Sequence, residues 1–174
     1  MSLERLFQQL ESHQRAPTEQ WDPPYCGELP IRIMANGDWH YQGSKINRPA
    51  LVKLFASVLK REGDDYYLVT PAEKVKIQVE DAPFVIVDWQ VMDIENQQAI
   101  QVVSNIDERY ILSAQTPLVL SDGIPYVQLG KGLTAKVHRN VFYQWAEMAT
   151  PVSGSEHHEF VIYSAGHAFS LGHG

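Results

Sequence analysis

Several sequence features that would assign a protein to a structural class are absent from this chain. Cys26 is the only cysteine among 174 residues, which excludes a disulfide framework and cysteine-rich zinc sites. No apolar run approaches the ~18 residues that a membrane helix needs; the longest, Pro83–Val87, has the length of a strand. The first 14 residues contain Glu4 and Glu11 and lack a small-residue cleavage site, so they do not resemble a signal peptide. Together these absences predict a cytoplasmic protein.

Positive charge is also scarce, since the net charge is −7. Residues 1–85 carry ten basic and twelve acidic side chains, whereas residues 86–174 carry four and nine, so the acidity lies mainly in the second half. Nucleic-acid binding needs a basic face that releases counterions, and anionic membranes attract clusters of Lys and Arg. The sequence has no such cluster, so neither a nucleic acid nor a membrane is expected as a partner.

Motifs of catalysis are absent too. There is no Walker loop, no Gly-x-Gly-x-x-Gly after a strand and no Gly-x-Ser-x-Gly elbow. The segment Glu156-His157-His158-Glu159 contains metal-ligating residue types, but adjacent histidines on a strand point to opposite faces. It is therefore interpreted as solvated, and Cys26 as a buried or incidental thiol rather than a nucleophile. We expect no enzyme, no metal and no cofactor.

What is present is an ordinary globular composition, with 44% hydrophobic and 20% charged residues, of a length that suits one or two small domains. Apolar spacing predicts a first helix over Ser2–His13. Residues 16–30 are rich in proline and predict a connecting segment, in which Trp21 and Tyr25 pack on the body. A second helix is expected over Pro49–Arg61, where one buried stripe combines Leu51, Leu54, Phe55, Val58 and Leu59.

A hairpin is predicted around Asn36-Gly37, between strands Ile31–Ala35 and Asp38–Gln42. Asn-Gly is the strongest short hairpin signal, because both residues of such a turn take a positive φ.

The rest of the chain reads mostly as short strands followed by one helix, Val141–Met148, with Asn140 as its cap. Phe84–Val91 has the composition of a buried strand. The other expected strands are Tyr66–Val69, Val75–Val79, Ala99–Ser104, Tyr110–Ser113, Pro117–Ser121, Tyr126–Leu129, Leu133–Val137, Phe160–Ser164 and Ala168–Leu171.

This pattern predicts an α+β fold of mostly antiparallel strands, because the connections are short and strands do not alternate with helices. A tyrosine-bearing strand leads into an alternating strand twice, at Tyr66-Tyr67 before Val75–Val79 and at Tyr126 before Leu133–Val137. The repetition suggests two related domains, 1–82 and 83–174, joined at the break Asp81-Ala82-Pro83.

Groups capable of chemistry are densest in two segments, Val69–Lys74 and Glu80–Phe84. One interpretation is structural, with a Thr-Pro corner, a strand break and a Lys–Glu pair. The other is the rim of a pocket. In that case Arg48, which precedes the helix at Pro49, and Lys74 would bind an anion, since a helix N-terminus adds to the attraction.

Several ordered motifs resemble an uncharacterised bacterial family, domain of unknown function 1285. The resemblance runs from about Trp21 to Met148. The residues that carry it are Asn36–Ser44, Ile46–Arg48, Leu51–Phe55, Leu68–Lys74, Val79–Phe84, Pro125-Tyr126 and Phe142-Tyr143.

The resemblance implies a two-domain α+β fold with duplicated structural motifs, whose C-terminal domain is superficially similar to pleckstrin-homology-like domains. It also implies a ligand site at the domain interface, for a nucleotide-based molecule with a role in signalling, and no enzymatic activity. The residues expected in that site are Trp39, Tyr41, Arg48, Thr70, Glu73, Lys74, Glu80, Asp81, Phe84 and Asn105.

The chain departs from the family pattern at two points. The pattern carries arginine in the segment that here reads Val103-Ser104-Asn105, and again near Gly130. Both arginines are missing, which weakens the case for an anionic ligand. The cations that remain as replacements are Arg48, Lys53, Lys74, Lys131 and Arg139.

Three functions follow, ranked in this order. The first is a non-catalytic small-ligand-binding or sensor protein. The second is a protein-interaction adaptor without a small ligand. The third is an enzyme that uses Glu73, Lys74 and Asp81 in acid–base roles.

Overall fold

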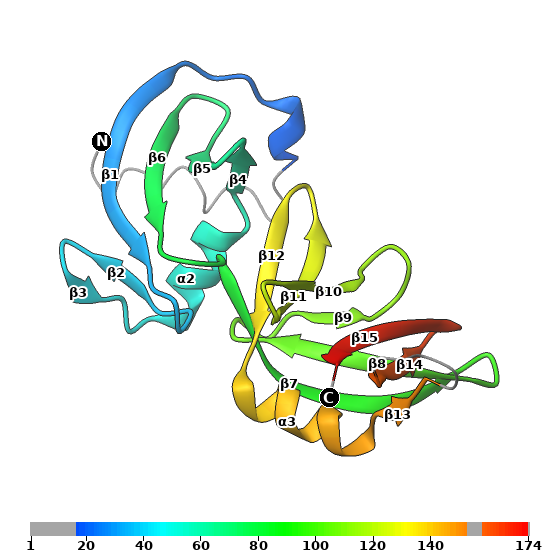
Figure 1. Ribbon diagram of the computed structural model, residues 1–174. Coiled ribbons are helices and arrows are strands. Elements are labelled where there is room, and N and C mark those ends of the chain that lie inside the picture. The colour runs from blue at the N-terminus through cyan, green and yellow to red at the C-terminus, as the bar shows by residue number, and fades with distance from the viewer. Residues whose placement is uncertain (1–16, 153–157, 174) are drawn as a thin grey trace. The chain divides into compact units, whose positions relative to one another are not determined.

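The computed structural model describes residues 17–152 and 158–173. The expected helix over Ser2–His13 lies outside these ranges. The chain forms two compact units, the first ending at Pro83 and the second beginning at Phe84 (Figure 1). None of the helices in the described ranges is long and apolar enough to cross a membrane.

Unit 1 contains a six-stranded sheet with the order β3-β2-β1-β6-β5-β4. Its two central strands, β1 and β6, are parallel, and every other neighbouring pair is antiparallel. The elements are a short 3-10 helix η1 (Thr18–Gln20), β1 (Tyr25–Ile33), β2 (Trp39–Tyr41), β3 (Ser44–Lys45), helix α2 (Pro49–Ala56), β4 (Leu59–Glu62), β5 (Asp65–Val69) and β6 (Lys74–Val79).

The core of unit 1 follows from strand alternation. On β6, Val75 and Ile77 are buried while their neighbours are more exposed, as the sequence predicted. The segment before Pro30 differs from expectation, because β1 begins at Tyr25. The ring of Tyr25 touches Tyr67 edge-on, with centroids 6.2 Å apart, yet it is 56% exposed.

Helix α2 is shorter than predicted. It ends at Ala56, and Leu59 already belongs to strand β4. Leu51, Phe55, Val58 and Leu59 are buried as expected, but Leu54 is only half-buried. The error arose because an apolar stripe with helical spacing also describes a short helix followed by the first residues of a strand.

The Asn36-Gly37 turn is also not the one predicted. Gly37 has a φ of 93°, but Asn36 does not have a positive φ. The backbone N–H of Gly37 donates to the carbonyl of Met34 at 2.9 Å, and the N–H of Met34 donates to the carbonyl of Asp38 at 2.8 Å. This is a type I turn followed by one left-handed residue, the three-residue hairpin loop, in which only Gly37 needs conformational freedom.

Two-residue turns with both central φ values positive do occur, at other places. They are Gln42-Gly43, Glu95-Asn96, Asp122-Gly123, Lys131-Gly132 and Ala165-Gly166.

Unit 2 contains a second six-stranded sheet, with the order β10-β11-β12-β7-β8-β9, and a three-stranded sheet β13-β14-β15 (Figure 1). The elements are β7 (Phe84–Ile94), β8 (Gln97–Ser104), β9 (Arg109–Ile111), β10 (Leu118–Ser121), β11 (Ile124–Gly130), β12 (Leu133–Val137), helix α3 (Arg139–Met148), β13 (Thr150–Pro151), β14 (Glu159–Ser164) and β15 (His167–His173).

Two details of unit 2 correct the sequence analysis. Strand β7 is buried only over Phe84, Val85 and Ile86, and Val87 and Val91 are about half exposed. The cap of α3 is His138 rather than Asn140: the Nδ1 atom of His138 accepts a hydrogen bond from the Asn140 backbone N–H at 3.1 Å. An imidazole nitrogen here performs the role usually given to a side-chain oxygen.

The two large sheets have the same connectivity, strand for strand. In each, the first and sixth strands are central and parallel, the second and third lie on one side, and the fourth and fifth lie on the other. Tyr67 pairs with Lys76 between β5 and β6, and Tyr126 pairs with Lys136 between β11 and β12. The repeated pattern of tyrosine strand and alternating strand therefore reflects a repeated topology.

The β14–β15 hairpin is attached to the large sheet of unit 2 through a buried serine. The Oγ of Ser164 accepts from the Ile100 backbone N–H and donates to the Leu112 carbonyl, both at 2.7 Å. The N–H of Ala165 donates to the Gln98 carbonyl at 3.0 Å. These bonds fix the turn end of the hairpin against β8.

Candidate functional site

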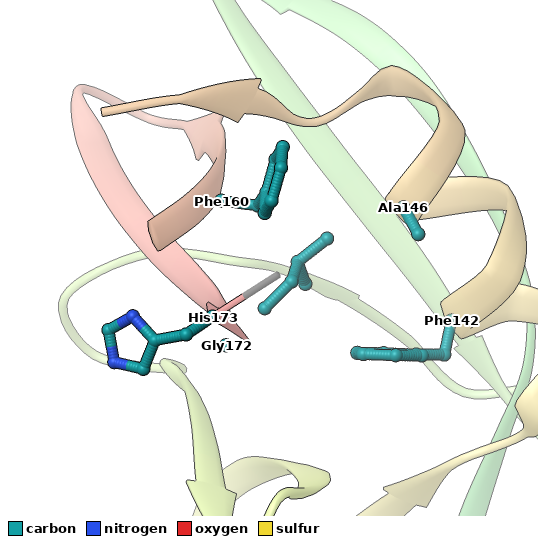
Figure 2. Close-up of a pocket in the computed structure, with 6 residues that line it drawn as sticks. Phe142, Ala146, Phe160, Gly172 and His173 are labelled. Atoms are coloured by element: carbon teal, nitrogen blue, oxygen red, sulfur yellow. The ribbon is translucent and has the colours of Figure 1, made fainter. Parts of the chain in front are cut away.

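A pocket of about 210 Å³ lies within unit 2, between helix α3 and the β14–β15 hairpin (Figure 2). Phe142 and Ala146 line it from α3, Phe160 from β14, and Leu171, Gly172 and His173 from β15. The lining is mostly apolar, and every lining residue belongs to one folded unit, so the pocket is a property of that unit alone.

Helix α3 supplies one wall because it carries two apolar rows. Val141 and Trp145 are buried, and the Trp145 ring meets Trp89 of β7 edge-on, with centroids 6.2 Å apart. The Nε1–H of Trp89 donates to the Oε1 of Gln144 at 2.6 Å, which ties the helix to the sheet. Phe142 and Ala146, each one residue further along, form the neighbouring row that faces the hairpin.

The opposite wall depends on a β-bulge. Phe160 pairs with Gly172 and Val161 with Ser170, so Leu171 is the extra residue on β15. Gly172 takes a φ of 106°, and its N–H donates to the Oγ of Ser170 at 3.1 Å. A bulge of this kind breaks strand alternation and re-aims a side chain, which is how Leu171 comes to line the pocket.

His173 is the one titratable residue in the lining. Its imidazole points away from Phe142 and Ala146 (Figure 2). The side chains inside the pocket, Phe142, Ala146, Phe160 and Leu171, contain no polar atom. These four side chains can bury an apolar group, and they offer an ion no hydrogen bond.

The residues predicted from the sequence lie elsewhere. Thr70 is fully buried, and its Oγ1 accepts from the backbone N–H groups of Glu73, at 3.0 Å, and Ala72, at 3.3 Å. The Thr70 N–H donates to the Glu73 carbonyl at 2.8 Å. Thr70 and Glu73 thus build the tight β5–β6 connection, which agrees with the structural interpretation of this segment.

Lys74 is engaged on the outer face of the unit 1 sheet. Its Nζ forms an ion pair with the Oε2 of Glu62 and lies 4.4 Å from the centroid of the Tyr67 ring. The hydrogen bond to Glu62 raises the pKa of Lys74, and the same bond lowers the pKa of Glu62. Lys60 also reaches Glu62, at 3.4 Å. A Lys–Glu pair is present, but its carboxylate is that of Glu62, which lies outside the two segments from which the pair was expected.

Glu80 lies at the other end of β6. Its Oε2 accepts from the Ala35 backbone N–H at 2.7 Å, and its Oε1 is 3.6 Å from the Nε of Arg32. Asp81 follows as an exposed residue. A strand of six residues spans roughly 20 Å, so Lys74 and Glu80 do not share one site within unit 1.

The predicted aromatic residues and the predicted cation before α2 do not form a shared site within unit 1. Trp39 is 1% exposed and stacks on Phe55, with centroids 6.4 Å apart, so its ring offers no open face. Tyr41 is half-buried on β2. Arg48 is exposed at the start of α2 and makes no side-chain capping bond there.

Phe84 and Asn105 belong to unit 2. Phe84 is buried at the start of β7. The backbone N–H of Asn105 donates to the Val85 carbonyl at 2.8 Å, and its Oδ1 accepts from the Val85 N–H at 3.0 Å. Asn105 thus ties the end of β8 to β7.

The residue types that bind metals are spread apart in the part of the chain that the structure describes. Within 17–152 and 158–173, no three His, Cys, Asp or Glu side chains gather so as to hold an ion. Glu156 and His157 lie outside these ranges. Cys26 is exposed, and its thiol donates to the Pro24 carbonyl at 3.2 Å.

The pocket was not predicted from the sequence. Its lining comes from a helix and two strands that are far apart in the sequence, and the bulge that admits Leu171 leaves no pattern apart from Gly172. The one available signal was the i, i+4 pair Phe142 and Ala146, which lies outside the buried row of α3.

The comparisons with known proteins identify the family. No curated protein matches the chain. Among solved structures, a DUF1285 family protein from Silicibacter pomeroyi DSS-3 is 36% identical, with a TM-score of 0.83, and the match covers 97% of this chain and 94% of that one. A DUF1285 family protein from Shewanella baltica OS155 is 34% identical, with a TM-score of 0.58, covering 68% and 91%.

Two family models match successive parts of the chain. The N-terminal domain of the domain of unknown function DUF1285 matches residues 16–82, and the C-terminal domain of the protein of unknown function DUF1285 matches residues 83–171. The resemblance found in the sequence motifs is thereby confirmed: this two-domain chain belongs to the DUF1285 family.

Proposed function

We propose that this protein is a non-catalytic ligand-binding protein that takes an apolar group of its ligand into the pocket of unit 2. One observation carries the proposal: the pocket has about 210 Å³ of space with an apolar interior. An engineered apolar cavity of about 150 Å³ is known to bind benzene, so the space suffices for a ring-sized group. Each methylene group buried there contributes about 0.8 kcal/mol.

The pocket is smaller than the roughly 300–1,000 Å³ of sites that enclose drug-sized ligands. It would hold one part of a ligand, and the rest would lie outside. A nucleotide-based ligand, suggested by the family resemblance, would fit only through its base, because the interior offers no cation to a phosphate. Arg48 and Lys74, the cations expected from the sequence to bind an anion, belong to unit 1 and are not part of this pocket. A signalling role in the cytoplasm, and a pleckstrin-homology-like C-terminal domain, complete the proposal.

The test is a thermal-shift screen of nucleosides, nucleotides and small apolar compounds against the whole chain. A ligand at about 100 times its Kd stabilises the native state by about 2.7 kcal/mol, which a melting curve resolves. The matched variant is Ala146→Phe, which fills the pocket from an exposed helix position. Its control is Glu147→Phe, which adds the same ring to the next exposed residue of α3, outside the lining.

Binding that is lost in Ala146→Phe and kept in Glu147→Phe supports the proposal. Binding that survives in both variants moves the site elsewhere. If no compound binds, the adaptor hypothesis takes the lead, and the exposed apolar side chains of unit 2, such as Val91 and Tyr143, become the surfaces to examine.

A further inference from the structure

The walls of the unit 2 pocket contain two aromatic rings. Phe142 and Phe160 line it from two different elements, helix α3 and strand β14 (Figure 2). Ala146 and Gly172 are the small residues of the lining. Two rings with a space beside them can accept a third ring in edge-to-face or offset geometry.

We infer that the group bound in this pocket is an uncharged aromatic ring, an inference that rests on the proposed function. Aromatic pairs gain about 0.5–1.5 kcal/mol beyond the burial of their area, which corresponds to about a two- to tenfold gain in affinity over a saturated ring of similar size.

The exclusion of charge follows from the same residues. Phe142, Ala146, Phe160 and Leu171 have no side-chain group that donates or accepts a hydrogen bond, and the His173 imidazole points away from Phe142 and Ala146 (Figure 2). A buried ion without a partner carries a large desolvation cost. A carboxylate or ammonium on the ring must therefore either stay outside the pocket or weaken binding.

The position of the negative charge strengthens the exclusion of anions. Glu159 pairs with His173 across the β14–β15 ladder, so a carboxylate-bearing residue stands at the same end of the hairpin. The half of the chain that contains the pocket also carries the larger share of the negative charge. An anionic substituent would meet this field at the rim.

Four compounds of similar size separate the contribution of the aromatic ring from the contribution of charge. Benzyl alcohol is aromatic and neutral, cyclohexylmethanol is saturated and neutral, phenylacetate is anionic, and benzylamine is cationic. Binding to the whole chain is measured by NMR titration at pH 7, following the methyl signals of Leu171, a lining residue that both variants retain. Ala146→Phe and Glu147→Phe serve again as the filled-pocket variant and its control.

The expected order places benzyl alcohol first, cyclohexylmethanol two- to tenfold weaker, and phenylacetate at least tenfold weaker than benzyl alcohol. Benzylamine, whose ammonium meets the negative field at the rim, should bind more tightly than phenylacetate. Equal affinity for the aromatic and the saturated alcohol overturns the aromatic inference and leaves the proposed pocket intact. Equal affinity of phenylacetate and benzyl alcohol overturns the exclusion of anions. If all four compounds fail to bind, or if they bind Ala146→Phe as well as the natural chain, the pocket proposal itself is wrong.

Discussion

The Oε2 of Glu80 accepts a hydrogen bond of 2.7 Å from the backbone N–H of Ala35, although 45 residues separate them in sequence. The contact follows from topology. Strands β1 and β6 are parallel, so their carboxyl ends meet, and the Glu80 N–H also donates to the Ile33 carbonyl at 2.9 Å. A residue expected to face a ligand thus holds the turn of the β1–β2 hairpin.

We predict that Glu80→Ala destabilises the protein by about 1 kcal/mol, since it removes the acceptor of a charge-assisted hydrogen bond at a partly exposed site. Glu80→Gln keeps an acceptor oxygen and should cost less. Urea unfolding of both variants measures the difference. Equal stability of Glu80→Ala and the natural chain would mean that the Ala35 N–H is satisfied by water at no cost.

The pair of Lys74 and Glu62 predicts a pH dependence. The hydrogen bond from Lys74 lowers the pKa of Glu62 below its ordinary value of 4.5. The stabilisation is therefore present above that ordinary value and is lost as the pH falls through the lower, folded-state pKa. Lys74, whose pKa is raised, keeps its contribution until the pH rises above its ordinary value of 10.5.

Glu62→Gln should reduce the loss of stability between pH 7 and pH 3, by less than about 1 kcal/mol because the pair lies at the surface. Asp64→Asn is the control, since the Asp64 side chain is fully exposed and its pair with Arg61, at 3.8 Å, is longer and more solvated than that of Glu62 with Lys74. Urea unfolding at the two pH values gives both differences. A change of the same size in the two variants would attribute the effect to net charge alone.

The β1–β2 turn yields a prediction that distinguishes the two turn types. In the observed loop only Gly37 has a positive φ. Gly37→Ala should cost about 1–2 kcal/mol, the penalty for a side chain in the left-handed region. Asn36→Gly should also destabilise, by about 0.5–1 kcal/mol, because it adds chain entropy and removes the Oδ1 that accepts from the Asp38 backbone N–H at 3.0 Å. In a two-residue turn with both φ values positive, Asn36→Gly would be neutral or stabilising, and thermal unfolding decides between them.

The structure shows which features of the fold could be predicted from the sequence and which could not. Strand alternation located β6 and β12, because burial on one face leaves a period of two. The repeated tyrosine strands suggested two related domains, and the structure has two sheets of the same connectivity. Alternation within one strand is a local pattern, whereas the parallel pairing of β1 with β6 and of β7 with β12 joins residues far apart in the chain and was not predicted.

Features that depend on distant partners could not be predicted. The roles of Glu80 and Lys74 depend on Ala35 and Glu62, residues that the sheet brings near, and no spacing encodes them. The end of α2 at Ala56 was missed for a similar reason, because Leu59 is buried as part of a strand paired with Leu68.

Helix α2 supplies a fourth prediction, which revises the expected burial of Leu54. Phe55 is fully buried and stacks on Trp39, so Phe55→Ala should cost about 3–5 kcal/mol. Leu54 is half-buried, and Leu54→Ala should cost clearly less than the 2–5 kcal/mol typical of a buried leucine. Chemical denaturation of the two variants side by side tests the ranking, and a larger loss for Leu54→Ala would reverse the placement of the helix face.

The last prediction concerns the buried serine that attaches the β14–β15 hairpin. Ser164→Ala leaves the Ile100 N–H and the Leu112 carbonyl without their partner in a dry environment. An unsatisfied buried group costs about 1–3 kcal/mol, so the variant should lose roughly 2–4 kcal/mol of stability.

The control for Ser164→Ala is Ser57→Ala, because the Ser57 Oγ donates to the Leu54 carbonyl at an exposed helix end, where water can replace it. That variant should lose less than about 1 kcal/mol. Since the hairpin forms one wall of the pocket, Ser164→Ala should also weaken binding of benzyl alcohol, whereas Ser57→Ala should not. A stable Ser164→Ala protein with unchanged affinity would show that the hairpin holds its position without this bond.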